Sequence, residues 1–284
     1  MADERPTSAP KQNGRPDLAT ILGVVIAAGG VTGGLIMEGG KLADVTQFTA
    51  AIIVVGGTVG AVMVSTPMTV LLGAGKRLIG VARETAQSRA ALIEELIGLA
   101  SRARKLGLVS LEQEAMALPD PFMRKAMTLA IDGTDLQDLH KMLQLEIDLT
   151  QHQAESEAKV FELAGGYSPT VGIIGAVLGL IQVMKNLANI DEVGHGIAVS
   201  FVATVYGVGL ANLLFLPVAT KIKSRARLES ERKELILEGV SSIVEGLNPK
   251  LIRAKLEAYA AGGTAKKSAE SSPAGAQTPA EVEI

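Results

Sequence analysis

The sequence predicts an all-α membrane protein, with four transmembrane helices in two hairpins, a cytoplasmic helical insert between the second and third spans, and a cytoplasmic C-terminal helix. Hydrophobic residues make up 48% of the 284-residue chain and are gathered in long blocks without charge. A helix needs about 20 apolar residues to cross the hydrocarbon core of a bilayer. The blocks approach this length and come in two pairs, which a long charged stretch separates.

The first hairpin begins after a polar, proline-rich lead. Its first helix is expected at Leu18–Met37, an apolar run too long for the hydrophobic region of a signal peptide, which indicates a retained span. The second helix begins after Asp44 and meets no charge until Lys76. Because this stretch is longer than the membrane requires, we expect the helix to tilt or to continue past Pro67.

The middle of the chain is charged and rich in helix-forming residues, which predicts a soluble helical insert. Apolar residues recur there at helical spacing, so one face of a helix should pack against a core. These residues are Leu92, Ile93, Leu96, Ile97 and Leu99. Pro119 and Pro121 should interrupt the pattern. A helix is then expected over residues 121–131, and a long one from about Leu136 toward the third span.

The second hairpin contains two apolar runs, residues 171–184 and 197–216, each with a proline on its outer side. Since the two helices run antiparallel, Pro169 and Pro217 should lie at similar depth. Pro169 fits the first turn of a helix, where a missing N–H is harmless. Pro217 follows an unbroken apolar run and removes a hydrogen bond that lipid cannot replace, so either tolerance or a functional role is open for it.

The predicted divisions of the chain follow from these elements. They are a disordered lead (1–17), a first transmembrane hairpin (18–74), a cytoplasmic helical domain (75–165), a second transmembrane hairpin (166–220), a cytoplasmic C-terminal helix (221–260) and a disordered, low-complexity tail (261–284). Lys and Arg are scarce in the two short links within the hairpins and frequent elsewhere. The positive-inside rule therefore places both termini and the insert in the cytoplasm.

Chemistry that would indicate an enzyme is missing from the spans, which offer no nucleophile with a base and no paired carboxylates. The three histidines are not at metal-site spacing, so we expect no metal site and no cofactor. A formal net charge of -3 gives no support for nucleic-acid binding. The only ionisable candidate in the membrane is Lys185, near the external end, where it would snorkel. If an ion passes this protein, the acidic group that carries it should belong to a partner.

Polar and small residues are what the spans do offer. Hydroxyls occur at Thr170, Ser200, Thr204 and Tyr206, although most intramembrane Ser and Thr side chains bond their own helix. Glycines at four-residue spacing let helix backbones approach closely. These pairs are Gly29 with Gly33, Gly30 with Gly34, Gly56 with Gly60, and Gly175 with Gly179. They fit packing within one chain or contact between subunits, which indicates a homo-oligomer as one of two alternatives.

These residues resemble the MotA family of flagellar stator subunits, which includes the PomA and MotP branches. The resemblance covers about residues 17–260. It rests on the double hairpin around an insert, on RKLGLVSLE at 104–112, on the P-x-x-G-I-I-G-A-V-L-G-L-I run from Pro169, and on A-T-V-Y-G followed by L-P in the fourth span. It implies a location in the inner membrane, with five copies of the chain around two copies of a MotB-like partner, whose single span brings the ion-carrying aspartate. Ion flow would turn the ring, and the insert would push on the rotor protein FliG.

The resemblance also assigns residues to the rotor contact. The family's rotor-contacting arginine and glutamate match Arg104 and Glu112, and Lys105 and Glu114 are weaker candidates. Without the resemblance, all four would be an ordinary solvated helix surface.

Four further positions are assigned to the ion pathway and its coupling. The family's two functional prolines match Pro169 and Pro217, where they are associated with coupling ion binding to cytoplasmic movement. In the sodium-driven branch a threonine stands seven residues after the first proline, where this chain has Ala176. Sodium needs several oxygen ligands to replace its water, whereas a proton needs one carboxylate, so Ala176 favours protons. Thr204 matches a threonine found in both branches.

Other functions compete with this one. An ExbB- or TolQ-like energiser of an outer-membrane process also surrounds a partner's aspartate-bearing helix, but resembles a three-span plan. A structural scaffold without ion coupling would tolerate Thr204→Ala or Pro217→Val. A secondary transporter is disfavoured, because broken helices with convergent polar groups are not evident.

Overall fold

The structure is a computed structural model that describes residues 15–81, 83–84 and 88–270. It divides into two compact units, and each is described by itself. The membrane unit comprises Met1–Ala86 and Leu149–Leu228, and the polar unit comprises Gln87–Asp148 and Glu229–Ile284. Residues 1–14 of the expected disordered lead and 271–284 of the expected disordered tail lie outside the described residues.

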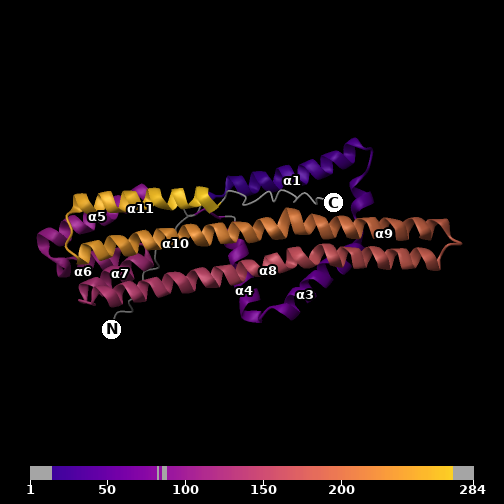
Figure 1. The fold of residues 1–284 in the computed structure, drawn as a ribbon. Helices are drawn as coiled ribbons and strands as arrows, with labels where there is room; N and C mark the ends of the chain where they lie inside the picture. Colours follow the sequence, from indigo (N-terminus) through magenta and orange to yellow (C-terminus); the bar gives the residue numbers. More distant parts are fainter. Residues whose placement is uncertain (1–14, 82, 85–87, 271–284) are drawn as a thin grey trace, which may run out of the picture. The chain divides into compact units, whose positions relative to one another are not determined.

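Nearly all the regular structure is helical, as predicted (Figure 1). In the membrane unit the elements are β1 (Arg15–Pro16), α1 (Leu18–Met37), the 3₁₀ turn η1 (Leu42–Val45), α2 (Phe48–Ala51), the π-helical segment η2 (Ile52–Gly56), α3 (Gly57–Ser65), α4 (Met68–Val81), β2 (Arg83–Glu84), α9 (Ile190–Gly209) and the π-helical segment η4 (Leu210–Phe215). In the polar unit they are α5 (Arg89–Leu106), the 3₁₀ turn η3 (Leu108–Leu111), α6 (Glu112–Ala117), α7 (Pro121–Ile131) and α11 (Pro249–Glu270). Two long helices, α8 (Leu136–Lys185) and α10 (Leu216–Val244), contribute residues to both units.

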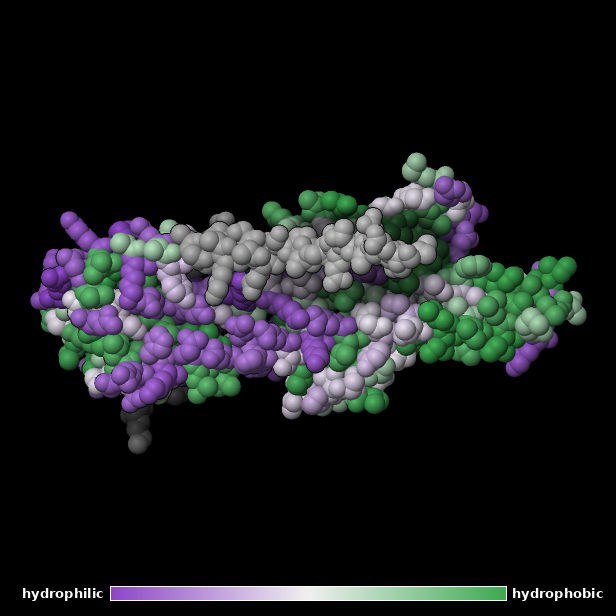
Figure 2. Space-filling view, viewed as in Figure 1, coloured by the Kyte–Doolittle hydropathy of each residue, from purple (hydrophilic) through white to green (hydrophobic). Residues whose placement is uncertain are grey.

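Four helical stretches of the described chain are long and apolar enough to cross a membrane, which confirms the predicted number of spans. They are Leu18–Met37, Phe48–Ser65 and parts of Leu136–Lys185 and Ile190–Val244. Their outer surfaces are apolar, as the green α8–α9 hairpin in Figure 2 shows. Exposed apolar side chains on such helices are expected where lipid is the solvent.

The second span of the first hairpin rules out one of its two expected alternatives, an unbroken helix past Pro67. Instead of continuing past Pro67, the helix ends at Ser65 and α4 starts again at Met68. A proline disfavours helical backbone in the residue before it. Thr66 is accordingly extended, with φ -136° and ψ 133°. The short strands β1 and β2 then pair antiparallel, with Arg15 opposite Glu84.

The α8–α9 hairpin is packed backbone to backbone through glycine. A Cβ added at Gly207 would lie 2.7 Å from the Ser168 carbonyl oxygen and 3.0 Å from the Gly172 Cα. One added at Gly179 would lie 2.8 Å from the Gly196 carbonyl oxygen. Small residues let membrane helices approach this closely. For Gly179, packing within one chain is therefore what the structure shows.

The remaining glycine pairs behave differently. A Cβ would meet nothing within 4 Å at Gly29, Gly33, Gly56 or Gly60 in the first hairpin, nor at Gly30 and Gly34. Contact between subunits stays a prediction for these positions.

Pro169 is not in a first helical turn, because α8 begins at Leu136 and runs through it without a break. A proline ring inside a helix clashes with the carbonyl four residues earlier and leaves one hydrogen bond unmade. That earlier residue is Gly165, which has no side chain to obstruct an adjustment. The Thr170 hydroxyl donates to the Tyr167 carbonyl at 2.8 Å beside the proline.

The core of the polar unit confirms the predicted apolar face of α5. Leu92, Ile93, Leu96 and Leu99 are buried, and Ile97 is packed at the edge of the same cluster. The cluster also takes large side chains from the other helices of the unit: Met123, Met127, Leu139, Leu143, Ile236 and Ile252. Truncating a fully buried leucine such as Leu96 to alanine would cost about 2–5 kcal/mol.

The C-terminal part corrects a second prediction. In place of one helix over 221–260, α10 ends at Val244 and α11 starts at Pro249. Gly246 allows the turn, since its φ is +71°, a value that glycine adopts without steric cost. Helix α11 also continues to Glu270, beyond the predicted start of the tail at 261.

Candidate functional site

The structure links two of the hydroxyls expected in the fourth span, those of Ser200 and Thr204, to Ala176 of the third span. The Ser200 hydroxyl lies 2.8 Å from the Ala176 carbonyl oxygen and 2.9 Å from that of Gly196. The Thr204 hydroxyl donates to the Ser200 carbonyl at 3.2 Å. Ala176 contributes no side-chain oxygen. Ala176, Ser200 and Thr204 are thus joined by a continuous chain of hydrogen bonds.

Tyr206 connects the fourth span to the first hairpin. Its hydroxyl donates to the Val45 carbonyl at 2.6 Å and accepts from the Gln47 N–H at 3.3 Å. These two hydrogen bonds attach the segment just before α2 to α9. In α2 itself, Ala50 is buried in one cluster with Val199 and Ala203 of α9.

Residues close to the two prolines pack against each other between α8 and α10. One turn before Pro169, a Cβ at Gly165 would lie 2.7 Å from a methyl group of Leu216, the neighbour of Pro217. The π-helical segment η4 ends just before Pro217, and the Leu216 N–H bonds to the carbonyl of Ala211, five residues earlier. This wider turn accommodates a residue that has no N–H to donate, and such π-bulges are frequent at functional sites.

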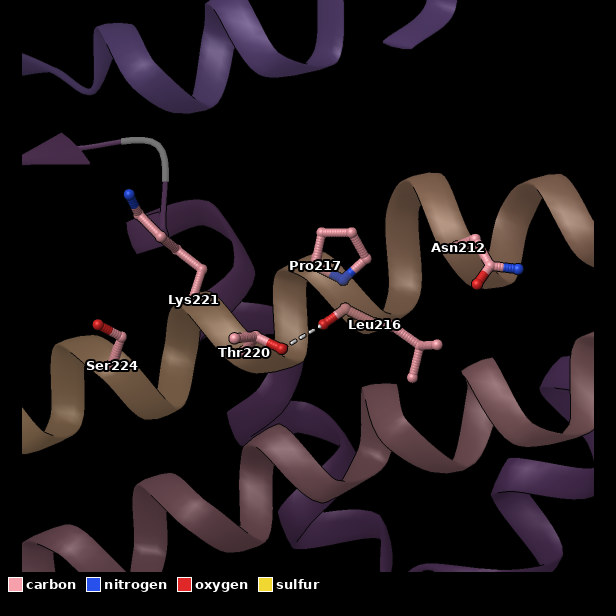
Figure 3. A pocket seen from close by; sticks show the side chains of 6 residues that line it. All are labelled: Asn212, Leu216, Pro217, Thr220, Lys221 and Ser224. Atoms are coloured by element: carbon pink, nitrogen blue, oxygen red, sulfur yellow. Dashed lines mark hydrogen bonds between the residues drawn. The ribbon is translucent and has the colours of Figure 1, made fainter. Parts of the chain in front are cut away.

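An open hollow of ≈ 570 Å³ adjoins Pro217 (Figure 3). The Thr220 hydroxyl, on its wall, donates to the Leu216 carbonyl at 3.0 Å. The lining residues are Asn212, Leu216, Pro217, Thr220, Lys221 and Ser224. Apolar and polar groups therefore meet at the turn where the π-helical segment becomes an α-helix.

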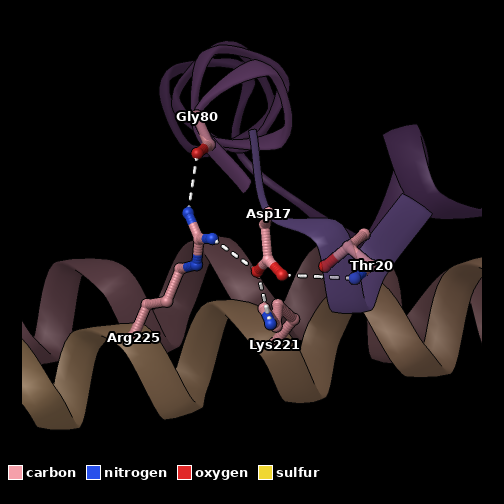
Figure 4. Close-up of polar contacts among 5 residues, drawn as sticks. All are labelled: Asp17, Thr20, Gly80, Lys221 and Arg225. Atoms are coloured by element: carbon pink, nitrogen blue, oxygen red, sulfur yellow. Dashed lines mark hydrogen bonds and ion pairs between the residues drawn. The ribbon is translucent and has the colours of Figure 1, made fainter. Parts of the chain in front are cut away.

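The sequence analysis does not predict an ionic cluster that forms around Asp17, the residue directly before α1. Asp17 is 6% exposed. Its carboxylate lies 2.6 Å from the Lys221 ammonium and 2.9 Å from the Arg225 guanidinium, and it accepts from the Thr20 N–H at 3.2 Å. Arg225 also donates to the Gly80 carbonyl of α4 at 2.8 Å (Figure 4). The cluster ties α1 and α4 to α10.

The charge state of Asp17 follows from these contacts. The hydrogen bond from Lys221, followed by that from the Thr20 N–H, holds the pKa of Asp17 well below its usual range. The carboxylate is therefore ionised at neutral pH. The sequence does contain a signal for this cluster: Asp17 directly precedes the first span, and Lys221 and Arg225 follow the fourth span four residues apart.

The predicted rotor-contact residues all lie in the polar unit, on α5 and α6. Arg104 and Lys105 are exposed in the last turn of α5, and Glu112 is exposed at the start of α6. Within the part of the chain that the structure describes, no ion pair involves these three residues. Glu114 differs from them, because it is ion-paired with Arg102.

Asp120, just after α6, joins α7 to α10. Its carboxylate accepts from the N–H groups of Phe122 and Met123 at 2.8 and 3.0 Å, which caps α7, and it is ion-paired with Arg232 of α10. Burial alone would raise its pKa, but Arg232 and the two N–H groups outweigh that effect, so the pKa of Asp120 is lowered.

Comparison with known proteins agrees with this architecture. The model for the MotA/TolQ/ExbB proton channel family matches residues 114–235, and the model for the Motility protein A N-terminal region matches residues 21–107. The chain is 34% identical to Motility protein A of Helicobacter pylori over 252 residues, which cover 89% of this chain and 98% of the relative.

Two solved structures share the fold. One is a C. jejuni MotAB structure, with a TM-score of 0.82 and 31% identity, covering 86% of this chain and 95% of that one. The other is the flagellar MotAB stator complex from Bacillus subtilis, with a TM-score of 0.79 and 28% identity, covering 87% and 98%. The chain therefore belongs to the motility protein A family of flagellar stator subunits, within the MotA/TolQ/ExbB proton channel family.

Proposed function

We propose that this chain is the ring-forming subunit of a proton-driven flagellar stator in the inner membrane. Five copies surround two copies of a MotB-like partner, whose single span supplies the aspartate that carries the ion. Proton flow turns the ring, and the polar unit, on the cytoplasmic side together with both termini, transmits torque to the rotor protein FliG.

The observation that carries this proposal is the absence of any acidic or basic side chain from the apolar spans. None occurs in residues 18–37, 48–65, 171–184 or 197–216. A channel protein that moves protons within one chain usually keeps an ionisable group in the membrane. The carrier should therefore come from a second protein, and the similar solved structures are of MotAB complexes.

Ala176 supports protons as the driving ion. The backbone carbonyl of Ala176 accepts a hydrogen bond from the Ser200 hydroxyl at 2.8 Å. The alanine side chain itself offers no oxygen that could bind sodium. A sodium ion leaves water only where several oxygens replace its hydration shell. A proton needs a single carboxylate.

The experiment that tests the driving ion uses a motile strain that lacks stators. The chain is expressed with its MotB-like partner, and swimming speed is recorded while sodium is replaced by potassium at constant pH, with and without a protonophore. We expect speed to be insensitive to sodium and abolished by the protonophore. Sodium-dependent swimming would overturn the proton assignment alone, and no swimming with a well-inserted complex would favour an ExbB-like energiser.

Torque transmission is tested by charge reversal. Arg104→Glu should impair swimming, and a compensating reversal on FliG should partly restore it. Lys250→Glu is the matched control, because Lys250 is also exposed in the polar unit but lies on α11. Normal swimming by both Arg104→Glu and Glu112→Lys strains would exclude this surface as the rotor contact.

A further inference from the structure

Two buried hydroxyl groups in the membrane unit have no hydrogen-bond partner. Thr58 of α3 is 1% exposed and Ser168 of α8 is 0% exposed. Within the part of the chain that the structure describes, neither side-chain oxygen has a hydrogen-bond partner. An unpaired hydroxyl is costly in an apolar interior, so buried polar groups are nearly always bonded to protein or to an ordered water molecule.

Other hydroxyls of the same unit are satisfied by their own helix. Ser65 donates to the carbonyl four residues earlier at 3.0 Å, and Thr204 does the same at 3.2 Å. This is the usual arrangement for serine and threonine in membrane helices. Thr58 and Ser168 depart from it, which indicates that their partner lies outside their own helix.

Helix α3 packs antiparallel against α8. A Cβ added at Gly57 would lie 2.7 Å from Cγ1 of Val171. Further along α3, Val62 is buried in one cluster with Ala164. These two contacts delimit a short stretch of each helix, residues 57–62 of α3 and 164–171 of α8.

The two unpaired hydroxyls lie within these stretches, on sides that face each other. Ser168 is three residues from Val171 and four from Ala164, so it shares their side of α8. Thr58 is four residues from Val62 and shares its side of α3. Both hydroxyls therefore belong to the same contact between the helices, at about the same depth.

Pro169 adds a third polar group to this contact. Because a proline has no N–H, the carbonyl of Gly165 loses the partner that a regular helix would provide. Helix carbonyls are directed along the axis toward the residue four positions later, so this one is directed at the turn that holds Ser168. Lipid cannot satisfy such a carbonyl.

We propose that the hydroxyls of Thr58 and Ser168 and the carbonyl of Gly165 bind one buried water molecule. The inference does not depend on the proposed function. A buried water typically makes about three hydrogen bonds to polar groups that would otherwise be unpaired. Here it donates to the Gly165 carbonyl and to one hydroxyl, and it accepts from the other hydroxyl. Through this water, α8 regains the backbone partner that Pro169 removes.

Water fits this site better than a cation. A sodium ion leaves water only where several oxygens replace its hydration shell. A buried positive charge also needs a compensating negative one. No acidic side chain occurs in residues 48–65 or 163–184.

A double-mutant cycle tests the shared water. Thr58→Val and Ser168→Ala are made singly and together, and the thermal midpoint of the purified protein, co-expressed with a MotB-like partner, is measured. Each single variant should lower the midpoint by roughly 2–4 °C. The double variant should lower it by clearly less than the sum, because the second substitution acts on a water that the first has already released.

Thr66→Val is the matched control. The Thr66 hydroxyl is also buried without a partner in the described chain, but it lies at the break after α3, about 12 Å along the axis from Thr58. Combined with Ser168→Ala, this substitution should be additive. Additive effects of Thr58→Val and Ser168→Ala, or single variants that raise the midpoint as removal of an unpaired hydroxyl would, overturn the proposal.

Electron cryomicroscopy of the same protein detects the water directly. We expect a density peak about 2.7–3.2 Å from both hydroxyl oxygens, and no such peak in the Ser168→Ala variant. A map that resolves other buried waters but shows no peak between Thr58 and Ser168 would refute the site. Should the double variant fail to assemble, this map decides.

Discussion

The ammonium group of Lys221 lies 2.6 Å from the carboxylate of Asp17, and it belongs to the helical turn that follows Pro217. This contact links the start of α1 to the part of α10 that adjoins the proline. Arg225, one turn further along α10, extends the link to the end of α4 through the Gly80 carbonyl.

Asp17→Asn should destabilise the protein at neutral pH and slow swimming. The carboxylate has a lowered pKa in the folded state, so its stabilisation is fully present above the unfolded pKa near 4 and is lost as the pH falls below it. The thermal midpoint of the purified complex should drop by roughly 2–5 °C at pH 7, and the difference from wild type should shrink below about pH 4. Glu162→Gln is the control. Glu162, on α8, is ion-paired with Lys223, which lies on α10 like Lys221, but this pair is exposed. Equal effects of both variants would show that the Asp17 cluster has no special role.

Gly207→Ala should force α8 and α9 apart. The new methyl group would lie 2.7 Å from the Ser168 carbonyl oxygen and 3.0 Å from the Gly172 Cα, where backbone cannot yield cheaply. We expect a loss of about 1–3 kcal/mol in unfolding free energy and a loss of swimming. Gly194→Ala on the same helix meets nothing within 4 Å and should have little effect. Thermal denaturation and swimming speed measure both variants, and a stable, motile Gly207→Ala strain would contradict the packing described.

Gly107→Ala should displace Leu106 and Val109. At φ 83° and ψ 154° an alanine is strained by about 1–3 kcal/mol. Gly98→Ala, in the middle of α5, is expected to act in the opposite direction, because alanine is favoured over glycine in a helix by about 0.5–1 kcal/mol and its Cβ meets only the end of Arg102 at 3.5 Å. Thermal midpoints of the two variants should therefore shift with opposite signs, and shifts of one sign would refute the backbone argument.

Pro217→Val should stop swimming without preventing membrane insertion. Valine restores an N–H that can bond four residues back, which removes the reason for the π-helical segment before it. Thr220→Val, which removes only the 3.0 Å bond to the Leu216 carbonyl, is the matched control. Swimming speed and the membrane-bound fraction are the measurements. Normal swimming by the Pro217→Val strain would favour simple tolerance of the proline.

The sequence was sufficient for much of the fold because its signals are local. Charge-free length located α1 at the residues observed, and helical spacing identified the buried face of α5. Local signals were insufficient where a residue's role depends on distant partners. Asp17 becomes part of a cluster only when α10 brings Lys221 and Arg225 beside it, and neither base is near it in sequence.

Two helix breaks that the sequence analysis did not predict, at Pro67 and at Gly246, have local physical causes. The helix ends before Pro67 although the sequence on both sides is apolar. The proline ring clashes with the helical backbone of Thr66 whatever the hydropathy of the neighbours. Gly246 turned the chain within a stretch of charged, helix-forming residues. The roles of Arg104, Glu112, Pro169 and Pro217 rest on the family resemblance, since charge and spacing alone are compatible with an ordinary helix surface.

The close glycine contacts between α8 and α9 fix the register of the two helices in the hairpin. Sliding by one turn would set Gly207 against the side chain of Ser168 or of Ala176 instead of against Gly172, which opposes any slip of the two helices past each other. We therefore expect the paired parts of α8 and α9 to move as one rigid body. Any bending has to be concentrated in the joint formed by the π-helical segment Leu210–Phe215 and Pro217, where helical hydrogen bonding is already irregular.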